Sequence, residues 1–283
     1  MCRKQNNLAL TEASTDGWCT DPTILTPTHA RQRFGSWRQI HTPYGATESL
    51  LVSTFTGSKV LSETIDLTRS GRGYCVGYPL SGVRLKIIKI VDHPIPKFSD
   101  VEELPCGEKG EIIIKSPVVS SSYFELPEQN ALHKIYEDNK SNTSSPWHRI
   151  GDIGYIDEQG RLWFCGRKTH RVETGETTLY TVCCEAIFNK HPRVFRSALV
   201  GIGKDRYMQT PAIVLEPVKE QFPATTTAKD EFTGQLLDLA RNNPLTQEIH
   251  HVLFHPSFPV DIRHNAKIFR EKLATWAQTQ LRL

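Results

Sequence analysis

The sequence lacks the features that mark several classes of protein. Its 7 cysteines include no Cys-x-x-Cys pair, which argues against a disulfide framework and a zinc ribbon. The 34 basic and 31 acidic residues leave a net charge of +3, too balanced for a surface that binds nucleic acid. No apolar run approaches the roughly 18 residues of a transmembrane segment, and no signal peptide is evident. These absences predict a cytoplasmic protein.

Regular structure is predicted only after a weakly patterned start. Residues 1–36 are polar and without periodicity, and we expect them to be disordered. Beyond them, alternation and short apolar runs indicate strands over 83–87 with a β-bulge at 88–90, over 111–115, and over 154–156 and 161–164 with a four-residue turn between them. Residues from about 70 to 165 are therefore predicted to form an antiparallel β unit.

The pattern changes after residue 166, where strands alternate with helices. The expected helices are 182–189, 231–241 and a last one from near Asn265, and the expected strands are 197–202, 212–215 and 251–254. This order predicts a compact two-layer α+β or α/β domain that folds by itself, because its elements supply a complete core. Cys183 and Cys184 are expected to be buried in its first helix.

A five-residue segment, Tyr-Gly-Ala-Thr-Glu at 44–48, carries side chains suited to a nucleotide. An aromatic ring can stack on a base, a glycine admits close approach, a hydroxyl can bind phosphate, and a carboxylate can hold Mg²⁺. We expect the segment to follow a short strand over 39–42. By itself it also fits an ordinary turn.

A second constellation joins Asp152 and Arg167. Asp152 ends the run Trp-His-Arg-Ile-Gly-Asp at 147–152, and Arg167 follows Gly166. At the two ends of a β-hairpin, both side chains can bind the vicinal hydroxyls of a ribose. The alternative is a surface ion pair of little energetic weight.

The third candidate is Lys267, which we expect two residues into the last helix. A lysine there is unfavourable, because cations suit the opposite end of a helix. That misfit hints at a function, although an ordinary surface lysine is the alternative.

In this order the segments resemble the AMP-forming adenylating enzymes, which include acyl-CoA synthetases, firefly luciferase and peptide-synthetase adenylation domains. The resemblance covers roughly residues 37–283 and rests on 44–48, 147–152, 166–167 and Lys267, with further likeness at 76–79, 107–112 and 191–194. Segments 41–48, 164–174 and 258–267 look like the olefin-biosynthesis branch, whose β-lactone synthetases are often labelled fatty acid CoA ligases.

Several positions depart from the superfamily pattern. Ile150 replaces a hydroxyl residue, Thr169 stands at the hinge, and Ala266 precedes the lysine where Gly is usual. Nothing in residues 1–43 resembles the Ser/Thr/Gly-rich loop that wraps the nucleotide phosphates. Since the family is about twice as long, we expect this chain to be its C-terminal half.

The resemblance implies an α/β (α+β) fold of truncated adenylating-enzyme type. Its expected parts are an unmatched segment 1–36, a remnant of the large N-terminal α/β domain at 37–68, a β-barrel-like subdomain at 69–166, and a small C-terminal domain with the catalytic lysine at 167–283.

The resemblance also implies the residue roles. The catalytic residues would be Lys267, Thr47 and Glu48, with Glu48 holding Mg²⁺, and the ATP/AMP-binding residues would be Tyr44, Gly45, Ala46, Asp152 and Arg167. Tyr44 would stack on adenine, while Asp152 and Arg167 would hold the ribose.

The implied activity is ATP-dependent activation of a long-chain β-hydroxy fatty carboxylate as an acyl-adenylate, leading to a β-lactone. Two alternatives stay open: a long-chain fatty acid CoA ligase, which would need CoA, and a catalytically silent remnant. The expected partners are the fatty carboxylate and either other olefin-biosynthesis enzymes or a separate N-terminal half.

Overall fold

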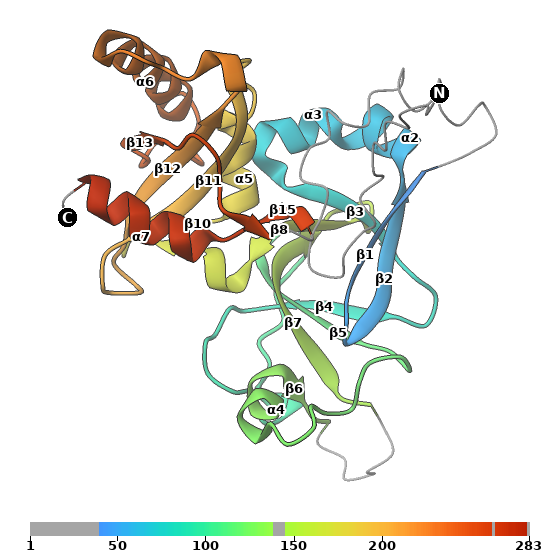
Figure 1. Cartoon of the computed structure of the whole chain (residues 1–283). Helices are drawn as coiled ribbons and strands as arrows, with labels where there is room; N and C mark the ends of the chain where they lie inside the picture. The colour runs from blue at the N-terminus through green and yellow to red at the C-terminus, as the bar shows by residue number, and fades with distance from the viewer. Residues whose placement is uncertain (1–39, 138–144, 262–263, 282–283) are drawn as a thin grey trace, which may run out of the picture.

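The computed structural model describes residues 40–137, 145–261 and 264–281 (Figure 1). The disorder expected for residues 1–36 lies outside these ranges. Within them, one large antiparallel sheet precedes a group of smaller sheets with three helices of eight or more residues. The α/β class with an antiparallel β unit, expected from the sequence, is confirmed.

The large sheet has 8 strands, in the order β1-β2-β3-β8-β7-β5-β4, with β6 paired to β7. Their bounds are β1 His41–Ala46, β2 Ser49–Thr56, β3 Tyr74–Pro79, β4 Arg84–Ile88, β5 Gly110–Lys115, β6 Lys134–Ile135, β7 Trp147–Ile156 and β8 Leu162–Arg167. The connections carry α2 Gly57–Lys59, η2 Val60–Thr64, α3 Ile65–Leu67, η3 Thr68–Arg72, η4 Phe98–Asp100 and α4 Pro127–His133.

Two of the strand predictions have different outcomes. The hairpin of β7 and β8 is confirmed, with Ile156 paired to Leu162 and a turn closed by Gly160 N donating to Asp157 O at 2.8 Å. The bulge predicted at 88–90 is wrong, because β4 pairs with β5 in one register and ends at Ile88. Beyond that point the chain pairs with residues 102–104 instead, since Lys89 N donates to Glu102 O.

The C-terminal part is built on a three-stranded sheet in the order β11-β12-β13, with β12 and β13 parallel. Its elements are η5 Lys168–His170, β9 Val172–Glu173, β10 Thr178–Leu179, α5 Thr181–Phe188, β11 Val194–Ile202, β12 Thr210–Pro217, η6 Lys219–Gln221, α6 Thr226–Arg241, β13 His251–Phe254, β14 Val260–Asp261, β15 His264–Ile268 and α7 Arg270–Leu281. The strand predicted at 251–254 is confirmed to the residue.

This sheet carries helices on both faces, one layer more than the sequence pattern indicated. Leu199 and Ile213 point to one face and pack with Phe188 of α5 and Phe232 of α6. Val200 and Val214, one residue further along each strand, belong to the other face, where Leu273 and Ala277 of α7 pack with them. Successive side chains of a strand face opposite sides, so both faces of these apolar strands are buried.

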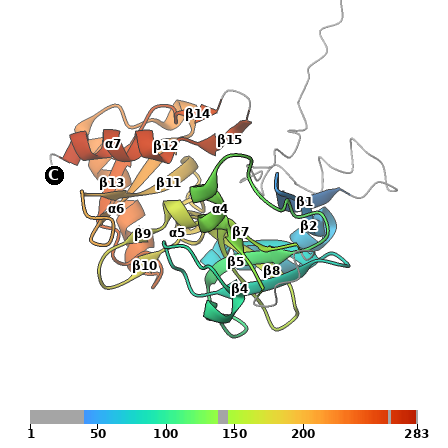
Figure 2. The same ribbon diagram turned by 90° about the horizontal axis from the view of Figure 1, so that it is seen from below.

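Helix α5 lies between the two parts of the molecule (Figures 1 and 2). All eight of its residues are buried. Cys184 and Phe188 belong to the core of the three-stranded sheet, whereas Val182 and Cys183 pack into the cores of the large sheet. The predicted burial of Cys183 and Cys184 is confirmed, and one short helix serves hydrophobic cores on both sides.

Candidate active site

The β1–β2 hairpin carries the segment at 44–48. Tyr44 and Ala46 lie inside β1, so the expectation that the segment follows a strand ending at residue 42 is wrong. Ala46 pairs with Ser49, which leaves Thr47 and Glu48 as the two-residue turn. Thr47 is exposed and Glu48 is half-buried. The predicted phosphate and Mg²⁺ ligands therefore stand next to one another at the tip of a hairpin.

Gly45 is required by the hairpin itself. The register of β1 against β2 shifts between Tyr44 and Ala46, where Gly45 alone faces residues 50–52, so β2 bulges opposite Gly45. A Cβ built on Gly45 would lie 2.8 Å from Leu51 N and 2.9 Å from Ser49 O, both backbone atoms that cannot swing away. A glycine is thus explained here by close approach of two strands, without any ligand.

Asp152 is the centre of a hydrogen-bonded group with Tyr44 and Arg167. The Tyr44 hydroxyl donates to Asp152 Oδ2 at 2.7 Å, and Arg167 Nη1 donates to Oδ1 at 2.9 Å. Asp152 of β7 is the direct partner of Arg167 of β8, as expected for the two ends of a hairpin. The Asp152 side chain is 5% exposed and that of Arg167 is 42% exposed, so the group joins the core to the surface.

The ring of Tyr44 lies in the core of the large sheet. It is 1% exposed, and its centroid is 6.1 Å from that of Phe164. Burial, together with the negative charge of Asp152, raises the pKa of the Tyr44 phenol well above its usual value. The phenol therefore stays protonated and donates to Asp152. The ring is enclosed in this structure. Stacking of Tyr44 on adenine stays a prediction.

Glu48 lies against a cluster of polar side chains. Its Oε1 accepts a hydrogen bond from the Tyr123 hydroxyl at 2.8 Å, and its Oε2 lies 4.0 Å from Nε2 of His148. Burial tends to raise the pKa of Glu48, but the hydrogen bonds from the Tyr123 hydroxyl and from a backbone N–H, together with the charge of Lys134, outweigh it, and the pKa falls below its usual value. Glu48 is therefore ionised near neutral pH.

The neighbours of Glu48 have shifted proton affinities. Burial, followed by the charge of Lys134, lowers the pKa of His148 to about 4. Burial lowers the pKa of Lys134 to about 8, with the charge of Glu48 opposing it. Near neutral pH, His148 is thus neutral and Lys134 is predominantly charged.

The residues present fit a Mg²⁺ held jointly with a nucleotide. Within the described ranges, no group of three or more His, Cys, Asp or Glu side chains could form a closed metal cage. Mg²⁺ commonly uses one or two carboxylates together with substrate phosphates and water. The half-buried, ionised carboxylate of Glu48 at the hairpin tip is a donor of that kind.

Lys267 lies on a different sheet from these groups. It belongs to β15, which pairs with β14, and α7 starts only at Arg270. The prediction of a helix beginning near Asn265 is therefore wrong, and the helix-dipole argument for Lys267 no longer applies. The pairing of Val260 with Ile268 keeps this segment extended, a contact over eight residues that helix periodicity does not reveal. Its catalytic role stays a prediction.

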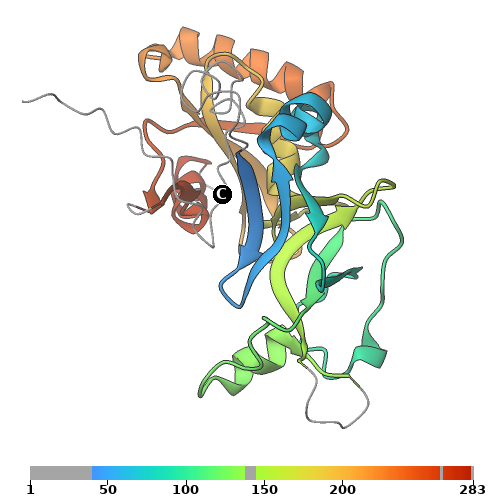
Figure 3. The same cartoon turned by 90° about the vertical axis from the view of Figure 1, so that its right-hand side faces the viewer.

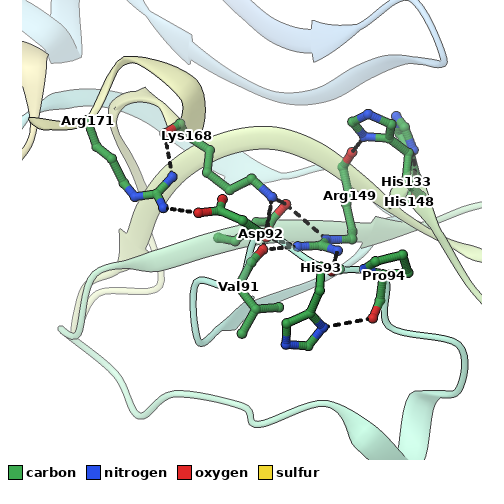
Figure 4. A network of polar contacts seen from close by, with 10 residues as sticks. Val91, Asp92, His93, Pro94, His133, His148, Arg149, Lys168 and Arg171 are labelled. Carbon is green, nitrogen blue, oxygen red and sulfur yellow. Dashed lines mark hydrogen bonds and ion pairs between the residues drawn. The ribbon is translucent and has the colours of Figure 1, made fainter. Parts of the chain in front are cut away.

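A buried network of charged side chains holds Lys168, which starts the segment 168–171 around the expected hinge residue Thr169 (Figure 4). Arg149 Nη2 lies 2.6 Å from Glu111 Oε2, and both side chains are 1% exposed or less. Lys168 Nζ lies 3.1 Å from Glu111 Oε1 and donates to Val91 O at 3.2 Å. Arg149 further donates to the carbonyls of Val91 and His93 and from Nε to Glu111, so each of its three guanidinium nitrogens has a partner.

The end of the same segment is held by Arg171. Its guanidinium bonds Asp92 and Glu173, and it donates to the carbonyl of Lys168 at 2.8 Å. Thr169, the expected hinge residue, is exposed between these two anchors. The hinge is thus fastened to the loop around residue 92 on both sides of Thr169.

Sequence reasoning missed Glu111, Arg149 and Tyr123. Arg149 stood inside the segment 147–152 and Glu111 began a predicted strand, yet neither was given a role. The available signal was a charged residue in an otherwise apolar strand, which a buried position permits only with a partner. Tyr123 follows a loop of Ser and Pro and gave no comparable signal.

Comparison with known proteins gives matches that extend over most of this chain. No family model matches the sequence. Olefin beta-lactone synthetases from Xanthomonas campestris pv. campestris and Stenotrophomonas maltophilia are 45% and 44% identical to it over 242 and 245 residues. The chain is a homologue of these two synthetases, and it is also 30% identical to a putative acyl-CoA ligase from Bacillus subtilis over 168 residues. It spans 43% of the length of these two relatives and is matched over 86% of its own.

Solved structures show the same fold. An amide bond synthetase from Marinactinospora thermotolerans superposes with a TM-score of 0.66 at 24% identity, over 90% of this chain and 45% of that protein. An o-succinylbenzoate CoA synthetase from Bacillus subtilis, solved with the acyl-adenylate intermediate OSB-AMP, superposes with a TM-score of 0.61 at 20% identity, over 89% and 43%. The adenylating-enzyme fold expected from the sequence is confirmed for this part. None of the described helices is both long and apolar enough to span a membrane.

Proposed function

We propose that this chain supplies the nucleotide-binding hairpins and the lysine-bearing C-terminal unit of an enzyme that activates a long-chain β-hydroxy fatty acid with ATP and converts it to a β-lactone. The observation that supports this most directly is the Tyr44–Asp152–Arg167 group beside the Thr47–Glu48 turn. Identity of 45% to an olefin beta-lactone synthetase supports the choice of product. The expected unit boundaries, 69–166 and 167–283, are part of this proposal.

In the proposed reaction, Asp152 and Arg167 hold the ribose and fix the adenosine. A carboxylate has about four lone-pair sites, and Asp152, which accepts hydrogen bonds from Tyr44 and Arg167, carries the kind of acceptor that binds ribose hydroxyls. Thr47 donates to the phosphate, and Glu48 holds Mg²⁺, which neutralises phosphate charge when bound.

The proposed chemistry has two steps. A carboxylate oxygen of the fatty acid attacks the α-phosphorus of ATP, the bond to pyrophosphate breaks, and an acyl-adenylate forms. Lys267 places positive charge where the α-phosphoryl oxygens gain negative charge, the kind of preorganised stabilisation that lowers such barriers. The substrate's β-hydroxyl oxygen then attacks the acyl carbon, loses its proton and displaces AMP, closing a four-membered lactone.

The proposed partners are the fatty carboxylate and the remaining part of the adenylating fold, either as a separate chain or in a longer protein. Other olefin-biosynthesis enzymes are further proposed partners. A reducing cytoplasm is the proposed location, and it is supported by the free thiols of Cys75, Cys106, Cys165, Cys183 and Cys184.

The test is carboxylate-dependent exchange between ATP and pyrophosphate. We expect none from this chain alone. Joined to the part of the Xanthomonas campestris relative that it does not match, the chain should catalyse exchange with β-hydroxy fatty acids. Lys267→Ala should abolish that exchange, whereas replacement of Lys272, an exposed residue of α7, by Ala should not. An unchanged exchange rate in Lys267→Ala would show that the lysine does not take part in the reaction.

Product analysis separates the remaining alternatives. A lactone formed without CoA supports the proposal, and a thioester formed only after CoA is added would identify a CoA ligase instead. If the joined protein folds and shows neither exchange nor product, the chain is a catalytically silent remnant.

A further inference from the structure

Glu48 is held from two directions by the connection between β5 and α4. The Tyr123 hydroxyl donates to Glu48 Oε1 at 2.8 Å. Ser120 N donates to the backbone carbonyl of Glu48 at 2.9 Å. The first bond orients the side chain, and the second fixes the hairpin turn from which it projects.

Tyr123 is itself fixed by Asn130 of α4. Tyr123 N donates to Asn130 Oδ1 at 2.6 Å, and Asn130 Nδ2 donates to Tyr123 O at 2.9 Å. The Tyr123 ring packs edge-on against His133 and His148, with centroids 6.0 and 6.4 Å away. A side chain clamped at its backbone and on its ring directs its hydroxyl to one place.

Ser120 is fixed by Lys134 of β6. Lys134 Nζ donates to Ser120 O at 2.6 Å and to Ser120 Oγ at 3.0 Å, and it lies 5.3 Å from the centre of the Tyr123 ring. Lys134 is only 1% exposed. Burial of an ammonium group is costly unless its donors are satisfied. The hydrogen bonds of Lys134 to Ser120 satisfy two of them and fix the loop that contains Ser120.

We propose that Tyr123, anchored by Asn130, is a positioning residue that aims the Glu48 carboxylate at a divalent cation bound with nucleotide phosphates. This inference rests on the proposed function. Carboxylates that bind metals are themselves hydrogen-bonded, and loss of such a partner typically costs about 10- to 100-fold in metal affinity. Tyr123 has this relation to Glu48, and with Asn130, Ser120 and Lys134 it forms what we call the Glu48 brace.

The experiment measures ATP binding to the chain by calorimetry, with Mg²⁺ titrated and with EDTA. Tyr123→Phe removes only the hydroxyl. Its matched control is Tyr155→Phe. The Tyr155 hydroxyl donates to the backbone carbonyl of Arg72 at 3.1 Å and has no bond to the Glu48 brace. We expect Tyr123→Phe to need about tenfold more Mg²⁺ for half-maximal strengthening of ATP binding. Affinity in EDTA should not change, and Tyr155→Phe should behave as wild type.

A second variant keeps the test decisive. Asn130→Ala leaves the Tyr123 hydroxyl in place but releases its anchor, and it should raise the Mg²⁺ requirement in the same direction. Equal Mg²⁺ requirements in wild type, Tyr123→Phe and Asn130→Ala would overturn the positioning role while leaving the nucleotide site standing. Failure of the wild-type chain to bind ATP, with Mg²⁺ or with EDTA, would overturn the nucleotide site and the brace with it.

Discussion

At the scale of single residues, the two carboxylates of the candidate site have different neighbours. Asp152 is nearly enclosed and bonds a buried phenol and a partly exposed guanidinium. Glu48 is half-buried and bonds the Tyr123 phenol. The enclosed carboxylate is suited to fixed hydrogen bonds with sugar hydroxyls. The more accessible one is suited to a cation that arrives with its own water and phosphate ligands.

Replacement of Asp152 should weaken AMP binding more than replacement of any other residue of the site. Asp152→Ala removes the acceptor for the ribose hydroxyls, and hydrogen bonds to charged groups contribute about 1.5–3 kcal/mol each. Tyr44→Phe is the control, because it removes a donor to Asp152 and keeps the ring. Calorimetric titration of AMP should rank wild type, Tyr44→Phe and Asp152→Ala in falling affinity. Equal affinities of wild type and Asp152→Ala would remove Asp152 from the site.

Mild acid should destabilise the protein through His148. Burial lowers the folded-state pKa of His148 from 6.5 to about 4, so between these values the unfolded chain binds a proton that the folded chain does not. The free energy of unfolding should then fall as pH falls, by up to about 1.4 kcal/mol per pH unit. His170, whose pKa burial and Arg270 also lower, acts in the same direction.

Urea unfolding at pH 7 and pH 5 measures this effect. His148→Gln cannot titrate, so it should lose less stability than wild type between the two pH values. Most carboxylates protonate below pH 5, so their titration contributes little to the difference between pH 7 and pH 5. Identical losses in wild type and variant would show that His148 is not held neutral by burial.

At the scale of elements, local geometry explains residues that also belong to a functional motif. Gly45 allows the bulge that brings β1 onto β2. Gly166, with φ +130, is the penultimate residue of β8, and a Cβ there would lie 2.3 Å from Thr181 Oγ1 at the start of α5. Both glycines stand beside proposed ligands of the nucleotide, and both are required by packing whether or not a ligand binds.

Gly45→Ala should destabilise the β1–β2 hairpin. The added methyl group would meet backbone atoms of Leu51 and Ser49 at 2.8 and 2.9 Å, so the strands must separate. Gly234→Ala is the matched control, because nothing lies within 4 Å of its Cβ position in α6 and alanine favours a helix by about 1 kcal/mol over glycine. Thermal unfolding should show a lower Tm for Gly45→Ala and an unchanged or higher Tm for Gly234→Ala. The reverse order would contradict the bulge argument.

At the scale of the whole molecule, α5 makes the two parts interdependent. Gly71 of η3 lies directly against α5, since a Cβ there would be 2.9 Å from Cys183 O and 3.3 Å from Ile187 Cδ1. Figure 3 shows the C-terminal sheet and its helices beside the large sheet. The C-terminal part has a core of its own, but Val182 and Cys183 of α5 pack into the cores of the large sheet.

A fragment of residues 167–283 should therefore fold and yet expose the free side of α5. Its sheet and helices α6 and α7 keep their packing, whereas Val182 and Cys183 lose the covering that the large sheet provides. Thiol labelling followed by mass spectrometry should modify Cys183 in the fragment and not in the whole chain, where it is 1% exposed. Cys184, packed toward the fragment's own core, is the internal control. Equal protection of Cys183 in both proteins would contradict this shared packing.

The sequence by itself determined the features that depend on neighbours along the chain. The β7–β8 hairpin, the strand at 251–254, and the pairing of Asp152 with Arg167 all follow from short-range periodicity and turn chemistry. The order of motifs along the chain also indicated the family before any fold was known. Such signals are local, because side-chain alternation and hairpin register are set within a few residues.

Only the tertiary structure decided which distant residues meet. Glu111 and Arg149 are 38 residues apart, and Glu48 and Tyr123 are 75 apart, and no periodic pattern links such pairs. The residues around Lys267 predict the start of a helix, but they form a strand, because pairing with β14 outweighs local preference. Charged and polar side chains become buried where a partner arrives from another strand, and that arrival is fixed by the sheet order and not by the sequence around either residue.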